Sequence, residues 1–164
     1  MSAAMGIEVR PLNHADREWA RHFLRERWGT TRMVSTSGVH EVDQLPGLVA
    51  VLEGKPAGLL TYSTKGDQLE IVTIDSGVEN RGVGSALVDS VRQLAERRGA
   101  RRLWLVTTND NLRALGFYQR RGFVLAALHR DAMESVRAIR PEVPQVGLDG
   151  IPLRDMLELE SLLG

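Results

Sequence analysis

The sequence contains no cysteine among its 164 residues. Disulfide bonds, thiolate metal sites and cysteine nucleophiles are therefore excluded. It is also poor in lysine, since Lys55 and Lys65 are the only lysines among 21 basic residues. The other basic residues are arginines, and we interpret this bias as genomic rather than functional.

An excess of charge of either sign is absent, since 21 basic residues balance 21 acidic residues. This balance does not favour nucleic acid or an anionic membrane surface as a partner. No apolar run approaches the length of a membrane span, and residues 1–10 have neither a basic cluster nor an apolar core. The sequence therefore predicts a cytoplasmic protein that binds no nucleic acid and no membrane.

The composition that remains is typical of one ordinary globular domain, with 43% hydrophobic and 26% charged residues. We predict a single domain over residues 1–164, which is long enough to cover one core. In its second half a strand over 102–107, a helix over 111–121 and a strand over 122–128 follow one another. This alternation predicts an α/β or α+β fold class.

The remaining elements follow from hydrophobic spacing and turn residues. A strand over 7–11 precedes a helix that Asn13 or Asp16 caps and Gly29 ends. An antiparallel meander of three strands follows, over 47–53, 57–63 and 68–74. Residues 33–36 fit a short strand, and residues 37–43 are interpreted as a loop.

The C-terminal part is less regular. A helix is predicted over 131–140, with Met133, Val136 and Ile139 facing inward. Prolines and glycines then punctuate an irregular segment. The tail over 153–160 fits a helix and a strand equally well.

The most informative stretch is a strand–loop–helix passage over residues 69–94. The β-prone run 69–74 leads into glycines at 82 and 84, after which apolar residues recur every three or four positions. The first amides of such a helix lack backbone partners and favour a phosphate, and Gly82 and Gly84 have no β-carbon to block its approach. A tight turn into a buried helix is the equally weighted alternative.

Two common phosphate-binding motifs do not fit this passage. A dinucleotide loop carries a third glycine and an acidic residue about 20 positions later, at the end of the next strand. Here the third glycine is missing and the next strand ends in Thr107, Thr108 and Asn109. The Gly-Lys-Ser/Thr of a P-loop is also absent. The phosphate must therefore belong to another kind of ligand.

A second motif, N-x-x-A-x-x-x-Y-x-x-x-G-F, begins at Asn111 and ends at Phe123. The loop E-N-R-G-V-G-S-A-L matches the pattern [QR]-x-x-G-x-[GA], except that Glu79 replaces the usual Gln or Arg. Together the two motifs closely resemble the GNAT superfamily of acetyl-CoA-dependent acetyltransferases, over about residues 56–128. The carboxylate of Glu79 should point away from a bound pyrophosphate or weaken its binding slightly.

The resemblance implies a GNAT fold, in which a mixed, mostly antiparallel central sheet of about six or seven strands is flanked by helices on both faces. That fold closes with a strand, so residues 153–160 are predicted to form one. The implied activity is an N-acetyltransferase that moves the acetyl group directly from the CoA thioester to an amine. An acetyl-cysteine intermediate is excluded by the composition.

The resemblance also implies where acetyl-CoA (CoA), the only cofactor predicted, would bind. The sheet would splay between the strands at 68–74 and 102–107. Backbone groups of the first strand and two residues of the second motif would contact the pantetheine arm, and the first amides of the helix would hold the pyrophosphate. The implied cofactor-binding residues are Val72, Ile74, Arg81, Gly82, Val83, Gly84, Ser85, Asn111, Ala114 and Tyr118.

Tyr118 is the implied catalytic acid, with its hydroxyl near the thioester sulfur; the alternative is a packing aromatic. Glu70 is the candidate base, because it alternates away from Leu69 and Ile71 and some family members carry a catalytic Glu on this strand, offset in register. The alternative for Glu70, weighted above the catalytic role, is a carboxylate on a solvated sheet surface. The other candidates for the base are Asp75, Glu41, Asp43 and His40. No spacing of His, Asp and Glu suggests a metal.

The acceptor, an amine of a small molecule or a protein, is not specified by the motifs. Asp149 and Asp155 could attract a cationic amine, and Arg154 could pair with a carboxylate of the substrate; a solvated connector is equally consistent. A homodimer is compatible with the sequence. A non-catalytic module that binds acyl-CoA and regulates a partner is the alternative function, and Tyr118 favours the enzyme because a pure binder does not need that hydroxyl.

Overall fold

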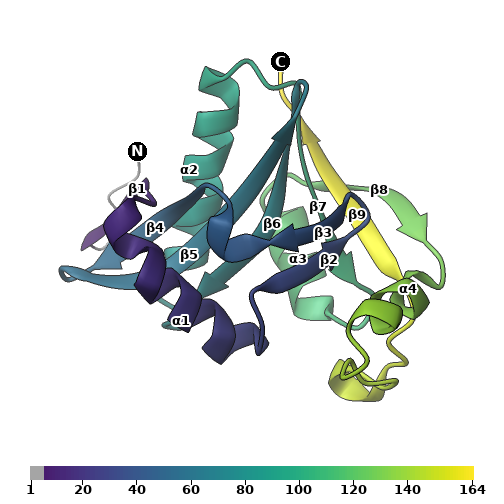
Figure 1. Cartoon of the computed structure of the whole chain (residues 1–164). Coiled ribbons are helices and arrows are strands. Elements are labelled where there is room, and N and C mark those ends of the chain that lie inside the picture. The colour runs from purple at the N-terminus through teal and green to yellow at the C-terminus, as the bar shows by residue number, and fades with distance from the viewer. Residues whose placement is uncertain (1–5) are drawn as a thin grey trace.

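The computed structural model describes residues 6–164, so residues 1–5 of the opening segment considered above lie outside it. A seven-stranded sheet has the strand order β1-β4-β5-β6-β7-β9-β8 (Figure 1). All neighbouring strands are antiparallel except β6 and β7, which are parallel. The strands are β1 (Ile7–Pro11), β4 (Gly47–Leu52), β5 (Lys55–Lys65), β6 (Gln68–Ser76), β7 (Arg102–Thr108), β8 (Val124–His129) and β9 (Met156–Leu162).

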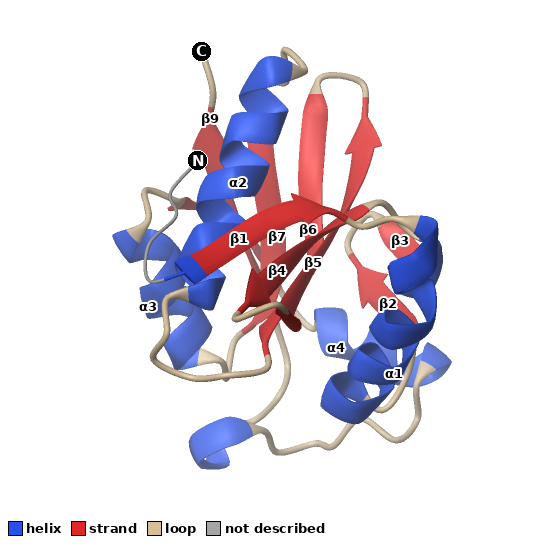
Figure 2. Cartoon of the chain, turned by 90° about the vertical axis from the view of Figure 1, so that its left-hand side faces the viewer, coloured by secondary structure: helices blue, strands red, loops and turns tan. Residues whose placement is uncertain are grey.

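Helices cover both faces of this sheet. Figure 2 shows α2 and α3 on one side, and α1, α4 and a small β2–β3 hairpin on the other. The predicted mixed, mostly antiparallel sheet with helices on both faces is thereby confirmed, as is the closing strand β9. The bounds are α1 (Arg17–Trp28), β2 (Arg32–Ser35), β3 (Gly38–Glu41), α2 (Val83–Arg97), α3 (Leu112–Arg120) and α4 (Ala132–Ile139), with short 3-10 turns at His14–Asp16, Val42–Gln44 and Leu148–Gly150.

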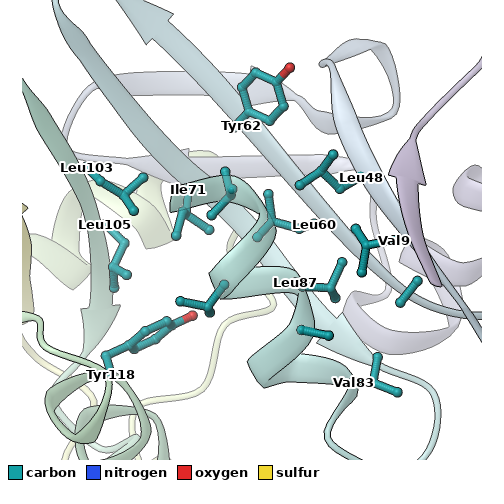
Figure 3. Packing of buried hydrophobic residues seen from close by; sticks show 14 of the residues in the cluster. Val9, Leu48, Leu60, Tyr62, Ile71, Val83, Leu87, Leu103, Leu105 and Tyr118 are labelled. Atoms are coloured by element: carbon teal, nitrogen blue, oxygen red, sulfur yellow. The ribbon is translucent and has the colours of Figure 1, made fainter. Parts of the chain in front are cut away.

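The α2 side of the sheet holds the larger core (Figure 3). Val83, Leu87 and Val91 are spaced by four residues, so they share one helix face and are all buried. Burying each contributes roughly 1.5–3 kcal/mol. A β-carbon at Gly58 would lie 2.5 Å from Val83 Cγ1, so this glycine lets the first turn of α2 approach β5 closely. The core therefore fixes the helix that begins at the glycine loop.

Two expectations about the other side of the sheet are wrong. Residues 37–43 are not simply a loop, because Gly38–Glu41 forms β3, which pairs with β2, and a 3-10 turn follows. Val39 is 49% exposed, so the strand lacks the buried alternation by which such an element is recognised. Ile139 is also exposed, because the single buried stripe of α4 ends with Met133 and Val136.

Asp16 joins β1 to the start of α1. Arg10 donates two hydrogen bonds to its carboxylate, at 2.6 and 2.9 Å, and the Asn13 amide donates a third. The hydrogen bonds from Arg10 are the main reason that the pKa of Asp16 lies below its ordinary value. A carboxyl with a lowered pKa stabilises the fold above its unfolded-state pKa of about 4 and loses this contribution as the pH falls through the folded value.

We therefore expect Asp16→Ala to lower the free energy of unfolding at pH 7 by about 1–3 kcal/mol, as for other hydrogen bonds to charged groups. The difference from the wild type should shrink below about pH 4. Urea unfolding at several pH values measures it. Glu41→Ala is the control, because the Arg32–Glu41 pair is exposed and should contribute at most about 1 kcal/mol. Equal losses in the two variants would contradict the expectation.

Candidate active site

The sheet opens between its two parallel strands. Residues 68–70 of β6 pair with residues 102–104 of β7, and beyond them the two strands diverge. A cavity of about 120 Å³ lies in this opening. It brings together residues that the second motif and β6 contribute, and its lining is Trp28, Ile71, Val72, Thr73, Ile74, Leu105, Val106, Thr107, Asn111, Ala114 and Tyr118. We call this cavity the gap.

A β-bulge accounts for the divergence. Thr61 pairs with Thr73 and Tyr62 pairs with Ile71, so Val72 has no partner on β5. The extra residue bends and twists the strand locally, which turns β6 away from β7. Beyond Glu70, the edge of β6 that faces β7 has no ladder partner there, so its backbone groups are available to an extended ligand.

Asn111 lies at the end of the gap, where it begins α3. Its side-chain oxygen accepts a hydrogen bond of 3.1 Å from the Ala114 amide and so caps the helix. The cap uses the side-chain oxygen, which leaves the side-chain NH₂ of Asn111 to donate a hydrogen bond to a ligand. Sequence reasoning predicted contact with the ligand but not the capping.

The glycine loop borders a second cavity, of about 350 Å³, which we call the loop cavity. Asn80 and Gly82 both adopt positive φ angles, 57° and 78°, and this turns the chain into α2. The amides of Val83, Gly84 and Ser85 occupy the first turn of the helix, where no intrahelical acceptor exists. All three residues line the cavity together with Gly82.

Three arginines in the lining of the loop cavity were not anticipated: Arg27, Arg113 and Arg121. Arg121 donates to the Ser85 hydroxyl at 3.1 Å and lies over the ring of Phe117, 3.6 Å from its centroid. Arg27 is bound to Asp75 at 3.1 Å. The basic residues beside the second motif were a signal for Arg113 and Arg121, whereas only the packing of α1 brings Arg27 here.

The contacts of Glu79, Arg81 and Gly84 add details that the sequence did not predict. The Glu79 carboxylate is 73% exposed and lies 3.9 Å from Arg113. The Arg81 guanidinium lies 3.6 Å from Glu53 and outside the cavity lining. A β-carbon at Gly84 would meet the Phe117 ring at 3.2 Å, so this glycine makes room for an aromatic side chain of α3.

Tyr118 lies where the gap meets the core, below Leu105 in Figure 3. Its ring packs edge-on against Phe117 and Phe123, with centroids 5.2 and 5.5 Å apart. Burial, and to a smaller extent the charge of Asp75, raise the pKa of Tyr118 well above that of a free tyrosine. The hydroxyl therefore keeps its proton at neutral pH and can act as a donor.

Glu70 is not on a solvated surface, since its side chain is only 4% exposed. It faces away from Leu69 and Ile71, as its position in the strand predicts, because those two residues pack in the α2 core. The β2–β3 hairpin covers it: the hydroxyls of Ser35 and Ser37 donate to its two carboxylate oxygens, the latter at 2.6 Å. Without the hairpin this carboxylate would be open to water.

A hydrogen-bonded chain leads from Glu70 toward solvent. Ser37 Oγ lies 2.6 Å from Glu70 Oε1 and 2.8 Å from His40 Nε2. The His40 ring itself is 3.9 Å from Glu70 Oε1, and its side chain is 13% exposed. Of the alternative bases named from the sequence, His40 is therefore the one that contacts the Glu70 cluster.

A third cavity, of about 240 Å³, lies against Glu70, and we call it the acceptor cavity. It shares five residues with the gap: Trp28, Val72, Val106, Thr107 and Asn111. Its walls come from the end of α1, β2, β6, β7, the start of α3, α4, β9 and the segment before β9. Its lining is Trp28, Met33, Val34, Ser35, Glu70, Val72, Val106, Thr107, Thr108, Asn111, Met133, Val136, Arg140, Val143, Leu153 and Met156.

The residues that the sequence suggested for substrate binding lie outside these three cavities. The Asp155 carboxylate is buried, where it accepts hydrogen bonds from Arg154 and from the Asp131 amide. Arg154 borders a separate surface hollow, and Asp149 is exposed. None of Asp149, Arg154 and Asp155 lines the gap, the loop cavity or the acceptor cavity.

The other candidate bases have partners of their own. Asp75 binds Arg27, Asp43 binds Arg21, and Glu41 binds Arg32. Across residues 6–164 no three His, Cys, Asp or Glu side chains are grouped so that they could hold a metal ion. In the same part of the chain, no helix has both the length and the apolar character that crossing a membrane requires.

A mixed sheet that splays between two parallel strands, with a glycine loop and a helix N-terminus beside the opening, is the architecture of the GNAT acetyltransferases. The model of the acetyltransferase (GNAT) family matches residues 13–123. The chain belongs to this family.

The chain is also similar to a relative over nearly its full length, and its fold is similar to those of solved acetyltransferases. The chain is 40% identical over 154 residues to the uncharacterized protein YdhI of Bacillus subtilis (strain 168), covering 93% of this chain and 96% of that protein. The fold is similar to that of the IAA acetyltransferase from Bacillus cereus ATCC 14579, with a TM-score of 0.74, 19% identity, and coverage of 96% and 99%. It is also similar to a Bacillus subtilis acetyltransferase in complex with CoA, with a TM-score of 0.67, 21% identity, and coverage of 96% and 98%.

Proposed function

We propose that this protein is an acetyl-CoA-dependent N-acetyltransferase that transfers the acetyl group directly to an amine. The observation that carries the proposal is the order of the three cavities. The loop cavity, the gap and the acceptor cavity follow one another along β6, from Asp75 through Ile74 and Val72 to Glu70. A ligand with an anionic end and a long arm would thus place its far end beside a buried carboxylate.

The residues present fit acetyl-CoA. Unpartnered amides at the start of α2 and the side chains of Arg113 and Arg121 suit its phosphates. The unpaired edge of β6 at Val72 and Ile74 suits the amide groups of the pantetheine arm. When bound, acetyl-CoA supplies an activated acetyl group as a thioester.

Glu70 is proposed as the base. An aliphatic amine has a pKa near ~10 and is protonated at neutral pH, so it must lose a proton before it can attack. Glu70 takes this proton and passes it through Ser37 to His40, which releases it to water. For this step the Ser37 hydroxyl rotates to donate to the His40 ring, and it turns back afterwards to donate to Glu70.

Tyr118 is proposed as the acid. The new bond joins the amine nitrogen to the acetyl carbon as the carbon–sulfur bond breaks, and Tyr118 gives its proton to the departing sulfur. The second proton of the former ammonium group restores the tyrosine hydroxyl. One proton leaves through Glu70 in each cycle, so the products are the acetamide and CoA.

Acetyl-CoA binding and CoA release in the presence of amines test this proposal. We expect Gly82→Val to weaken acetyl-CoA binding at least about tenfold, because a β-branched residue is strained at a φ of 78° and would distort the amides that follow. Gly99→Val is the matched control, since Gly99 lies beyond the other end of α2 at a φ of 73° with open space around it. It should lose similar stability and retain affinity.

Equal affinity in Gly82→Val and Gly99→Val would contradict the assignment of the loop. Acetyl-CoA binding without CoA release for any amine would instead favour the alternative of a non-catalytic acyl-CoA-binding module.

A further inference from the structure

The acceptor cavity has an unusual combination of walls. Most of its lining side chains are apolar, and they include Met33, Met133 and Met156, which are all the methionines of residues 6–164. These three come from β2, α4 and β9, so segments far apart in the sequence contribute flexible thioether side chains to one space. Methionine adapts to irregular shapes and makes favourable contacts with aromatic rings.

Only two residues in the lining of the cavity are charged, and only one of them is paired with a permanently charged side chain. Arg140 and Glu70 are the charged residues of its lining. Arg140 donates to Glu142 at 3.0 Å and to the Trp28 carbonyl at 3.5 Å, so its charge is already paired at the rim. In the part of the chain that the structure describes, Glu70 has hydroxyl partners and His40 at 3.9 Å, but no arginine or lysine within ion-pair distance.

The buried carboxylate and the apolar walls each favour a different part of a ligand. A buried carboxylate without a permanent cation is stabilised by one that enters with the ligand, such as an ammonium group. The remaining walls favour a body without charge, because an unpaired charge against them would lose its hydration without compensation. Trp28 and the methionines favour a body that is aromatic or aliphatic.

The volume limits the size of that body. An apolar cavity of about 150 Å³ accommodates benzene, and a water molecule occupies about 30 Å³ in the liquid. A volume of about 240 Å³ thus suits one aromatic ring with a short chain, or an alkyl chain of comparable volume.

We propose that the acceptor is a primary amine on a compact, uncharged apolar body, such as an arylalkylamine or a medium-chain alkylamine, and that Glu70 binds its ammonium group. This inference rests on the proposed N-acetyltransferase function and adds the class of substrate. It disfavours diamines, whose second ammonium would lie against a mostly apolar wall, and amino acids, whose carboxylate would enter a cavity that already holds Glu70.

Two matched pairs of amines test the inference with the wild-type protein, by CoA release from acetyl-CoA. The first pair is n-hexylamine and 1,6-diaminohexane, and the second is 2-phenylethylamine and phenylalanine. We expect kcat/KM to be at least about 10²-fold higher for the first member of each pair. The second ammonium of the diamine has no further carboxylate in the lining, and the carboxylate of phenylalanine finds Arg140 already paired with Glu142.

A variant tests whether the amine binds in the acceptor cavity. Met133→Glu places a second carboxylate in the apolar wall and should shift the preference toward 1,6-diaminohexane by at least about tenfold. Ile139→Glu is the control on the same helix, because Ile139 is exposed and outside the lining. It should leave the ratio unchanged. A shift in the control equal to that in Met133→Glu would overturn the placement of the acceptor in this cavity.

The outcomes separate the two levels of the proposal. Turnover of the diamine or of phenylalanine at rates equal to their partners overturns the substrate class and leaves the transferase intact. No CoA release with these four amines, when a different amine such as that of a peptide is acetylated, also overturns the substrate class alone. Acetyl-CoA binding without CoA release for every amine tested overturns the transferase and the substrate class with it. Preference for the apolar member in both pairs supports the inference even where Met133→Glu fails to fold.

Discussion

Replacing Tyr118 by phenylalanine is expected to lower kcat by about 10²-fold or more, with little change in acetyl-CoA affinity. The substitution removes one hydroxyl and keeps the ring that packs against Phe117 and Phe123. If the hydroxyl protonates the departing sulfur, its loss affects the step in which the carbon–sulfur bond breaks. Steady-state kinetics with a saturating amine, together with calorimetric binding of acetyl-CoA, measures both quantities.

The chain contains its own control, because Tyr62 is the only other tyrosine and is also buried. It lies on β5 within the same core, outside the three cavities (Figure 3). Tyr62→Phe should leave kcat unchanged. Equal kcat in wild type and Tyr118→Phe would show that Tyr118 is a packing residue.

The raised pKa of Tyr118 adds a dependence on pH. Burial favours the neutral hydroxyl, so the acid remains protonated through and above pH 10, where an ordinary tyrosine ionises. We therefore expect the wild type to show no loss of kcat from ionisation of this acid below about pH 10. A fall in kcat between pH 8 and 10 that disappears in Tyr118→Phe would contradict the raised pKa.

The second large effect is expected for Glu70→Gln, which should lower kcat/KM at pH 7 by about 10²–10⁴-fold. Glutamine keeps the size of the side chain and can still accept hydrogen bonds from Ser35 or Ser37, but it has no negative charge and cannot accept the proton. Because the variant cannot remove the proton, its activity depends on the fraction of the amine that is already neutral in solution. Its kcat/KM should therefore rise about tenfold for each pH unit between 7 and the amine pKa near ~10.

Two further variants sharpen this test. Ser37→Ala interrupts the path to His40 and should lower kcat by about tenfold, less than the loss of Glu70 itself, because water can replace the hydroxyl. Glu160→Gln is the control: by strand register Glu160 lies opposite Trp104, as Glu70 does, yet it lines none of the three cavities. A pH profile in Glu70→Gln parallel to that of the wild type would remove Glu70 from the role of base.

The sequence by itself determined the fold class, the family and the strand, loop and helices on which the proposed cofactor residues lie. Strand alternation, helix spacing and glycine at the start of α2 are local properties, and each requires only neighbouring residues to be recognised. The two motifs are separated by one helix and one strand, and their resemblance to the family implied that Asn111, Ala114 and Tyr118 lie beside the arm of the ligand. The structure brings these three to the gap with Val72 and Ile74.

Only the tertiary structure decided what surrounds Glu70. A charged residue that alternates with apolar Leu69 and Ile71 on a strand predicts an exposed carboxylate. The β2–β3 hairpin, however, covers this one and supplies two hydroxyls. The second strand of this hairpin, β3, was itself missed, since its pairing depends on packing rather than on a buried alternation. The same holds for the three methionines, which β2, α4 and β9 bring together at the acceptor cavity, and for Arg27, which α1 brings to the loop cavity.

The segment before β9 shows what a local pattern leaves open. Asp149, Arg154 and Asp155 stand in a loop rich in glycine and proline, and such loops often carry specificity. In the fold, however, the Asp155 carboxylate accepts a hydrogen bond from the Asp131 amide, which anchors the loop, and another from its neighbour Arg154. A charged residue in a sequence indicates that its side chain needs a partner. The three-dimensional contacts decide whether that partner is a ligand or another group of the protein.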